Sequence, residues 1–419
     1  FFFFLKKKKV SCVDILGRGS SHLYVSGENE QKNYLFVTGC YDGIVRIWNV
    51  ASVASSTTDG RASKTERVHT SFRANLSPIK GVSNLFCWNG HYYFGTACKN
   101  GSVKVLRMAL DLQTNSKIEE VADNTKEHRS SVECISAPNQ SKVFATGSVD
   151  TNIKLWRVDH NENSSDTADI FDITVEEPEN ETGLPPSKRI KLMSNTKTQQ
   201  TSNDQVLEMK TQSKKGTSSR MKSVSTLRGH REMITCLHWV NPYALYSASW
   251  DQSIRLWDTV KEIDVYTWQT SSAVTSLQYW TSQNVLISAH SNQKICIWDP
   301  RTNDVNAETL LSKSSRHTYR SHRLPISDIK CSEKENRPLF ISSSFDGTIK
   351  FWDLRSNEPL YMLNKHSDKV LCLEWINDTI VSGGADHQFV SIKMFFFNFV
   401  LFELWTFENS PIYQFNFQM

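Results

Sequence analysis

The sequence has no paired cysteines of the kind that bind metals. Its nine cysteines are scattered, and none belongs to a Cys-x-x-Cys pair. Most lie beside Ile, Leu or Val in segments that read as strands. We interpret them as small buried hydrophobes in a reducing compartment, not as disulfides or metal ligands. Cys236-x-His238, and His366 near Cys372, also lack metal-ligand spacing. We therefore expect no metal and no cofactor.

The sequence also lacks an excess of one charge and a long apolar run. Its 48 basic and 44 acidic residues give a net charge of +4, which does not by itself indicate a nucleic-acid-binding protein. The apolar stretch 395–407 is interrupted by Asn398 and Glu403 and is too short to span a bilayer. Phe1–Phe4 has neither a preceding positive region nor a following small-residue cleavage pattern, so we expect no signal peptide and no membrane partner.

What the sequence does contain is a repeated Asp-x5-Trp frame, flanked by short β-type runs. Full or softened copies begin at Asp42, Asn100, Asp150, Asp251, Asn292, Asp346 and Asp386. Self-similarity of this kind is typical of radial β-repeats, and seven four-stranded units close into one propeller. We predict an all-β, seven-bladed propeller over residues 10–394. Residues 1–9 would be an atypical N-terminal extension and 395–419 an atypical Phe-rich tail.

The repeat pattern stops between residues 159 and 223. Asp159–Ser187 contains nine acidic residues and no Lys or Arg, and a Ser/Thr/Gln/Lys-rich stretch follows. Few aromatics and blocks of charge predict a disordered insertion, in the connection between the third and fourth strands of blade three. Within it, Lys188, Arg189 and Lys191 follow two prolines and form a candidate nuclear localisation signal. The alternative is a solvated charge cluster.

Several repeats carry the same four polar groups, which we expect to be structural. In repeat four, His230, Ser247, Asp251 and Trp257 can form one hydrogen-bonded chain from indole to carboxylate. Equivalent residues are His128, Thr146, Asp150 and Trp156; His322, Ser342, Asp346 and Trp352; and His366, Ser382 and Asp386. Repeats one, two and five lack a well-placed His. A catalytic triad is rejected because an enzyme needs one such set with an oxyanion hole, not several.

The residue before each repeated acidic or amide position should ring one face of the propeller. These residues are Tyr41, Lys99, Val149, Trp250, Ser291, Phe345 and Ala385. Exposed aromatics anchor interfaces, so Tyr41, Lys99, Trp250 and Phe345 form a candidate partner-binding rim. Alternatively, Trp250 and Phe345 pack against neighbouring blades.

The Gly229-His230…Trp257-Asp258 unit identifies the chain as a member of the WD-repeat family. The insertion after repeat three, the 186–191 motif inside it, and the segments 249–258, 297–302, 366–371 and 383–386 further resemble the WD repeat-containing protein twelve family. That resemblance covers roughly 10–394 and is strongest from Leu227 onward.

The resemblance implies a scaffold in the nucleolus and nucleoplasm. It would belong to the PeBoW complex, together with block-of-proliferation-type and pescadillo-type proteins. That complex matures pre-60S particles and supports processing of the large-subunit rRNA precursors. Family members dock the ATPase midasin through an N-terminal ubiquitin-like domain. Because blade one begins at Val10, we expect no midasin docking by this chain.

Two other functions compete with the scaffold. A substrate-receptor propeller of a ubiquitin ligase would have an F-box-like helical module ahead of the blades, and we find none. An enzyme would need one convergent polar pocket. Closure of the ring is a separate expectation: blade seven needs an outer strand, and Phe395–Leu404 is apolar enough to supply it.

Overall fold

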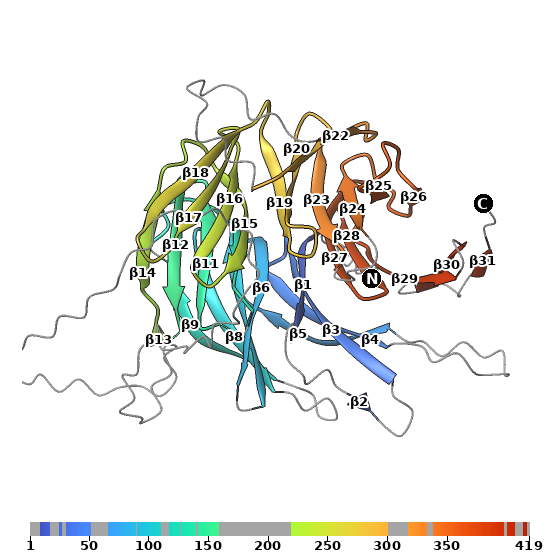
Figure 1. Ribbon diagram of the computed structural model, residues 1–419. Coiled ribbons are helices and arrows are strands. Elements are labelled where there is room, and N and C mark those ends of the chain that lie inside the picture. The colour runs from blue at the N-terminus through green and yellow to red at the C-terminus, as the bar shows by residue number, and fades with distance from the viewer. Residues whose placement is uncertain are drawn as a thin grey trace, which may run out of the picture.

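The computed structural model describes residues 9–16, 25–26, 31–51, 66–88, 90–109, 117–125, 127–139, 141–158, 219–300, 317–332, 338–397, 400–406 and 414–416. Their strands form seven sheets that stand side by side around a common centre (Figure 1). The predicted seven-bladed all-β propeller is confirmed. No helix in these ranges is long and apolar enough to cross a membrane.

Each blade contains four antiparallel strands, named a to d from the centre outward, and the sheets of blades one, two and seven contain a fifth strand. Blade one contains β1 (Val10–Leu16), β3 (Gln31–Cys40), β4 (Ile44–Ala51) and β5 (Glu66–Arg73), with β2 (Val25–Ser26) beside β3. Blade two contains β6 (Ile79–Trp88), β7 (His91–Cys98), β8 (Val103–Ala109) and β9 (Ile118–Asn124). Blade three contains β10 (Val132–Ser136), β11 (Val143–Ser148), β12 (Asn152–Arg157) and β14 (Ser223–Arg228).

The C-terminal half of the chain repeats the same order. Blade four contains β15 (Ile234–Asn241), β16 (Ala244–Ser249), β17 (Ser253–Asp258) and β18 (Ile263–Gln269). Blade five contains β19 (Val274–Trp280), β20 (Val285–His290), β21 (Lys294–Trp298) and β22 (His317–Arg320). Blade six contains β23 (Ile326–Cys331), β24 (Leu339–Ser344), β25 (Thr348–Asp353) and β26 (Tyr361–Asn364). Blade seven contains β27 (Val370–Ile376), β28 (Thr379–Gly384), β29 (Phe389–Phe397), β30 (Val400–Thr406) and β31 (Gln414–Asn416).

The second strand of each blade is buried on both faces because a neighbouring blade packs on each side. All six residues of β20 and of β24 are buried, so neither strand shows apolar–polar alternation. The polar residues in these strands therefore form hydrogen bonds inside the protein, and the small residues allow the neighbouring blade to pack closely.

Strand a carries the same irregularity in every blade. The register shifts once near the start of the strand, as between Val10 and Cys12 in β1. The equivalent shifts in the other six blades follow Ile79, Val132, Ile234, Val274, Ile326 and Val370. A bulge of this kind leaves one residue unpaired and redirects its side chain. These bulged residues line the central cavity.

Blade seven meets blade one through side chains, and its fourth strand comes from the tail. Asn377 donates a hydrogen bond from Nδ2 to the Tyr34 hydroxyl, at 2.8 Å. β30 pairs antiparallel with β29, from Ser391 opposite Thr406 to Phe397 opposite Val400. The expected outer strand, Phe395–Leu404, is thus divided between two strands: Phe395–Phe397 lengthens β29, and Val400–Leu404 belongs to β30, which pairs with β29.

The insertion is anchored earlier than predicted. Residues 159–218, which include Lys188, Arg189 and Lys191, lie outside the described residues. Ser219–Arg220 (β13) adds a parallel strand to β9 of blade two, and Ser223 already begins β14. The predicted disordered range of 159–223 is therefore too long at its C-terminal end, since backbone pairing orders these residues.

Candidate functional site

The four polar groups of blade four form one continuous hydrogen-bonded chain. Trp257 donates from Nε1 to the Ser247 hydroxyl, at 2.8 Å. That hydroxyl lies 2.7 Å from His230 Nε2, and His230 Nδ1 lies 2.8 Å from Asp251. With the proton on Nδ1, Ser247 donates to Nε2 and the imidazole donates to the carboxylate. Every member is satisfied inside the fold, so none is left for chemistry on a substrate.

The same geometry recurs in three other blades. In blade three, His128 lies 2.8 Å from Thr146 and 2.9 Å from Asp150. The corresponding distances in blade six are 2.7 Å (His322 to Ser342) and 3.0 Å (His322 to Asp346), and in blade seven 2.8 Å (His366 to Ser382) and 2.9 Å (His366 to Asp386). Trp156 and Trp352 complete two of these chains by donating to Thr146 and Ser342, at 2.7 and 2.9 Å.

The carboxylate at the end of each chain also fixes the turn that carries it. Asp251 accepts hydrogen bonds from the backbone N–H of Ser253 at 2.9 Å and of Arg231 at 3.0 Å. Burial alone would raise the pKa of Asp251, but hydrogen bonds from His230 and Ser253 hold it well below its usual range. The ionised carboxylate thus joins the b–c turn to the d–a connection before the blade.

Blade five contains a histidine that the repeat pattern did not reveal. His290 lies in strand b, and its Nε2 is 2.8 Å from the Ser288 hydroxyl. Ser288 accepts from Trp298 Nε1 at 2.8 Å, as Ser247 does from Trp257. Burial lowers the pKa of His290 to about 4, so this imidazole is neutral near pH 7. The repeat pattern places the histidine in the connection before strand a, whereas His290 reaches the Ser288 hydroxyl from within strand b itself.

Blades one and two use other groups. In blade one, Trp48 donates to Thr38 at 2.8 Å and Asp42 pairs with Arg46 at 2.9 Å. In blade two, Asn75 donates to Ser102 at 2.5 Å, so an amide replaces the imidazole. The b–c turns of blades one and two are thus held by different side chains from those of blade four. Such variation is expected of residues that stabilise the fold.

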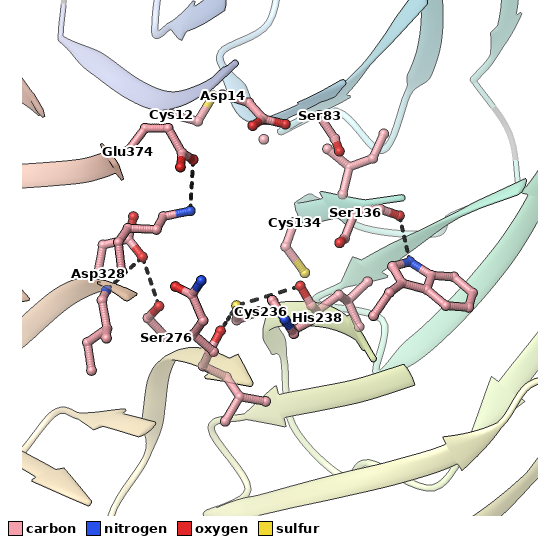
Figure 2. A pocket seen from close by; sticks show the side chains of 18 of the residues that line it. Cys12, Asp14, Ser83, Cys134, Ser136, Cys236, His238, Ser276, Asp328 and Glu374 are labelled. Carbon is pink, nitrogen blue, oxygen red and sulfur yellow. Dashed lines mark hydrogen bonds and ion pairs between the residues drawn. The ribbon is translucent and has the colours of Figure 1, made fainter. Parts of the chain in front are cut away.

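The seven a strands enclose a central cavity of about 1260 Å³ (Figure 2). Its charged side chains are paired across blades: Lys80 lies 3.1 Å from Glu133, and Lys330 lies 3.0 Å from Glu374. Asp328 accepts from Ser276 Oγ at 2.8 Å, and burial raises the pKa of this carboxyl. These contacts join consecutive blades and therefore stabilise the ring.

Asp328 also bridges to the following blade through backbone. Its Oδ2 accepts from the Leu373 N–H at 3.0 Å. Asp14 does the same between blades one and two, where it accepts from the Asn84 N–H at 2.8 Å. Both carboxylates lie on strand a at the cavity wall, so their first role is to connect blades.

The cysteines around the cavity have no metal-binding arrangement in the described residues. No group of three or more His, Cys, Asp or Glu side chains among them is placed to hold a metal ion. All nine cysteines are free thiols. Burial raises the pKa of Cys12 to about 12 and of Cys236 to about 11, which makes both poor nucleophiles at neutral pH. Cys12, Cys134, Cys236 and His238 surround the open space in Figure 2.

The predicted rim residues lie on the face formed by the b–c turns and d–a connections, which we call the b–c face. Trp250 is 51% exposed and Tyr41 is 39% exposed. Lys99 is also exposed. Phe345 is half-buried, and the Lys369 ammonium lies 5.0 Å from the centre of its ring. Lys369 therefore covers part of the Phe345 ring on the b–c face. Ala385 is only 4% exposed and does not belong to the rim.

Comparison with known proteins agrees with this architecture. The family described as WD domain, G-beta repeat matches residues 6–49, 121–157, 221–258, 261–299 and 313–353. These matches and the seven sheets make the chain a WD-repeat β-propeller protein.

Its similarity to known proteins extends over most of its length. It is 28% identical to the ribosome biogenesis protein WDR12 homolog of Culex quinquefasciatus, covering 89% of this chain and 72% of that protein. It is 26% identical to the homolog of Oryza sativa subsp. japonica (87% and 72%) and 27% identical to that of Nematostella vectensis (88% and 74%). The chain is thus a WDR12-like WD-repeat protein.

Proposed function

We propose that this protein is a non-catalytic scaffold in ribosome biogenesis, acting in maturation of the large subunit. The observation that carries the proposal is the similarity over 87–89% of the chain to proteins named for ribosome biogenesis. It spans the blades together with the connections between them, where a scaffold contacts its partners. In this proposal the chain joins a PeBoW-like complex with block-of-proliferation-type and pescadillo-type proteins and associates with pre-60S particles in the nucleolus and nucleoplasm.

The polar chemistry of the described residues supports a scaffold over an enzyme. The His–Ser/Thr–Asp chains recur in four blades, at closely similar distances. An active site requires one set with donors aimed at a developing oxyanion. In each of these chains the imidazole is instead enclosed by its own blade, and the carboxylate fixes a turn.

We place the partner contact on the b–c face around Trp250. An exposed indole is a costly feature of a surface and a frequent anchor of protein interfaces. Tyr41, Lys99 and Phe345 lie on the same face, in the b–c turns of blades one, two and six. The test is to replace Trp250 and Phe345 by Ala and to measure binding to the block-of-proliferation-type partner with purified proteins.

The matched control is Trp88→Ala, which removes an indole that is 36% exposed at the end of strand a, near the a–b turn on the opposite face. We expect the double variant to lose at least tenfold in affinity while Trp88→Ala keeps normal affinity. Equal affinity of both folded variants would remove the b–c face from the interface.

Nuclear entry is assigned to the basic cluster in the insertion. Lys188, Arg189 and Lys191 are replaced by Ala, and nuclear accumulation of the full chain is compared with that of a Lys214→Ala/Lys215→Ala control. Loss of accumulation in the first variant alone supports the signal. Normal accumulation of the triple variant in cells depleted of its partners would show that the cluster is only a solvated patch.

A further inference from the structure

Three blades hold an exposed arginine in the same position on the b–c face. Arg129, Arg231 and Arg323 each follow the histidine of a hydrogen-bonded chain. Their backbone N–H groups donate to Asp150, Asp251 and Asp346, each at 3.0 Å. The backbone is therefore fixed, while all three guanidinium groups remain exposed. Within the described part of the chain, none of them makes an ion pair.

The backbone of each arginine is held next to a b–c turn that carries an apolar residue, because the aspartate that accepts from the arginine N–H belongs to that turn. Val149, Trp250 and Phe345 immediately precede the three aspartates. Their N–H groups donate to the carbonyls of Ser131, Met233 and Pro325 at 2.9, 3.0 and 3.0 Å, which holds each turn against the connection that carries the arginine. We call these three Arg–apolar pairs the arginine rim.

The rim has the charge and polarity to bind an acidic segment with interspersed apolar side chains. The same face also exposes two further cations, Lys99 and Lys369, and two carboxylates, Glu232 and Asp368. With the three arginines, positive charge is therefore in excess among these residues. Guanidinium groups pair with carboxylates in bidentate geometry, and the neighbouring apolar groups receive aliphatic or aromatic side chains.

A segment with that chemistry exists in this chain. Residues 169–177 read Asp-Ile-Phe-Asp-Ile-Thr-Val-Glu-Glu, in which four carboxylates flank Ile170, Phe171, Ile173 and Val175. The segment belongs to the acidic half of the insertion, where residues 159–187 contain no Lys or Arg. We propose that residues 169–177 dock on the arginine rim of their own propeller.

The connection is long enough. Strand c of blade three ends at Arg157, and eleven residues separate it from Asp169. The twelve Cα-to-Cα steps from Arg157 to Asp169 reach about 40 Å when extended, whereas a six-residue strand such as β12 is about 20 Å long. The segment can therefore pass along the outside of blade three or four to the b–c face, and the 41 residues between 178 and 218 allow the return.

A single-stranded nucleic acid fits the rim less well. Bases require flat partners for stacking. Of the three apolar positions one is Val149, the nearby exposed Leu324 is also aliphatic, and the Phe345 ring already has Lys369 5.0 Å from its centre. Aliphatic side chains of a peptide match these groups better than bases do.

The test is site-specific photocross-linking in the full-length chain. A benzophenone amino acid replaces Phe171, or Thr211 in the Lys-rich half of the insertion as the matched control. Cross-linked peptides are mapped by mass spectrometry on purified monomer, without any partner. We expect position 171, but not position 211, to cross-link to the peptides that contain Arg129, Arg231 or Trp250.

A triple variant with Arg129, Arg231 and Arg323 changed to Glu should reduce that cross-link at least fivefold. It should still fold, because only backbone atoms of the three arginines serve the turns. Cross-links of position 171 to other surfaces, cross-links only between two chains, or an unchanged yield in the triple variant would each overturn the proposal. The proposal would also be overturned if a single-stranded RNA oligonucleotide bound to the rim with an affinity that does not change when the four carboxylates of residues 169–177 are replaced by amides. None of these outcomes depends on a role in ribosome biogenesis.

Discussion

Trp48 of blade one stacks on Phe389 of blade seven, with ring centroids 4.5 Å apart and planes 11° from parallel. Phe389 follows the last b–c turn, whereas Trp48 ends the first repeat frame, so this contact joins the two ends of the propeller. The buried cluster around it also includes Val10, Phe36 and Cys372. Ring closure in this chain therefore depends on side-chain packing between the first and last blades.

Gly383 tests this closure, because its place in strand b leaves no room for a side chain. A Cβ there would lie 2.5 Å from Val10 Cγ1 and 2.8 Å from Cys372 Sγ. We expect Gly383→Ala to lower the free energy of unfolding by about 1–3 kcal/mol, by overpacking. Chemical denaturation of Gly383→Ala, Val10→Ala and the double variant measures the coupling. The double variant should lose less unfolding free energy than the sum of the losses in the two single variants. Strictly additive losses would show that Gly383 and Val10 are not in close contact between the two blades.

The tail should contribute to stability through β30. Truncation after Met394 removes the strand that pairs with β29 from Ser391 to Phe397 and leaves an open sheet edge. We expect a lower melting temperature and concentration-dependent association, measured by calorimetry and light scattering. A truncation after Thr406, which keeps β30, is the matched control. If the chain truncated after Met394 is monomeric and melts at the same temperature as the full chain, the tail does not contribute to closure of blade seven.

The hydrogen-bonded chains predict that removing the strand-b hydroxyl lowers the free energy of unfolding by different amounts in different blades. Ser247→Ala leaves both Trp257 Nε1 and His230 Nε2 without their partner, whereas Thr38→Val in blade one deprives Trp48 Nε1 of its acceptor and removes only one further, long hydrogen bond of 3.4 Å to the Arg46 carbonyl. Each buried unsatisfied group costs about 1–3 kcal/mol. The loss from Ser247→Ala should thus be about twice that from Thr38→Val in urea unfolding. Similar losses in both variants would mean that the imidazole contributes little.

His290 should make stability depend on pH. Burial depresses its pKa from the ordinary 6.5 to about 4, so the unfolded chain binds a proton more readily than the folded one. The stability from the neutral imidazole is complete above pH 6.5 and is lost as pH falls toward 4, by about 3 kcal/mol in all. His290→Gln keeps a polar partner for Ser288 and removes the titration. Its unfolding free energy should fall less over that window, and parallel curves for the two proteins would contradict this assignment.

Much of the fold follows from spacing alone, since a repeated turn plus a repeated tryptophan determines where each blade lies. The sequence could not indicate His290, because the same hydroxyl is reached there from strand b instead of from the preceding connection. Nor could it show that Ser219–Arg220 adds to blade two, because two residues carry no periodic signal. Phe345 looked as free as Trp250, yet Lys369 from the neighbouring loop lies 5.0 Å from its ring. Contacts between loops depend on three-dimensional approach, which composition does not encode.

The most direct test of the scaffold account is replacement of the endogenous protein by a rapidly degradable copy, followed by a time course of rRNA precursors. We predict that large-subunit precursors accumulate before any change in small-subunit precursors. We also predict that the intact chain restores normal processing, while the Trp250→Ala/Phe345→Ala variant does not. Normal ratios of large-subunit precursors after complete loss of the protein would contradict the account.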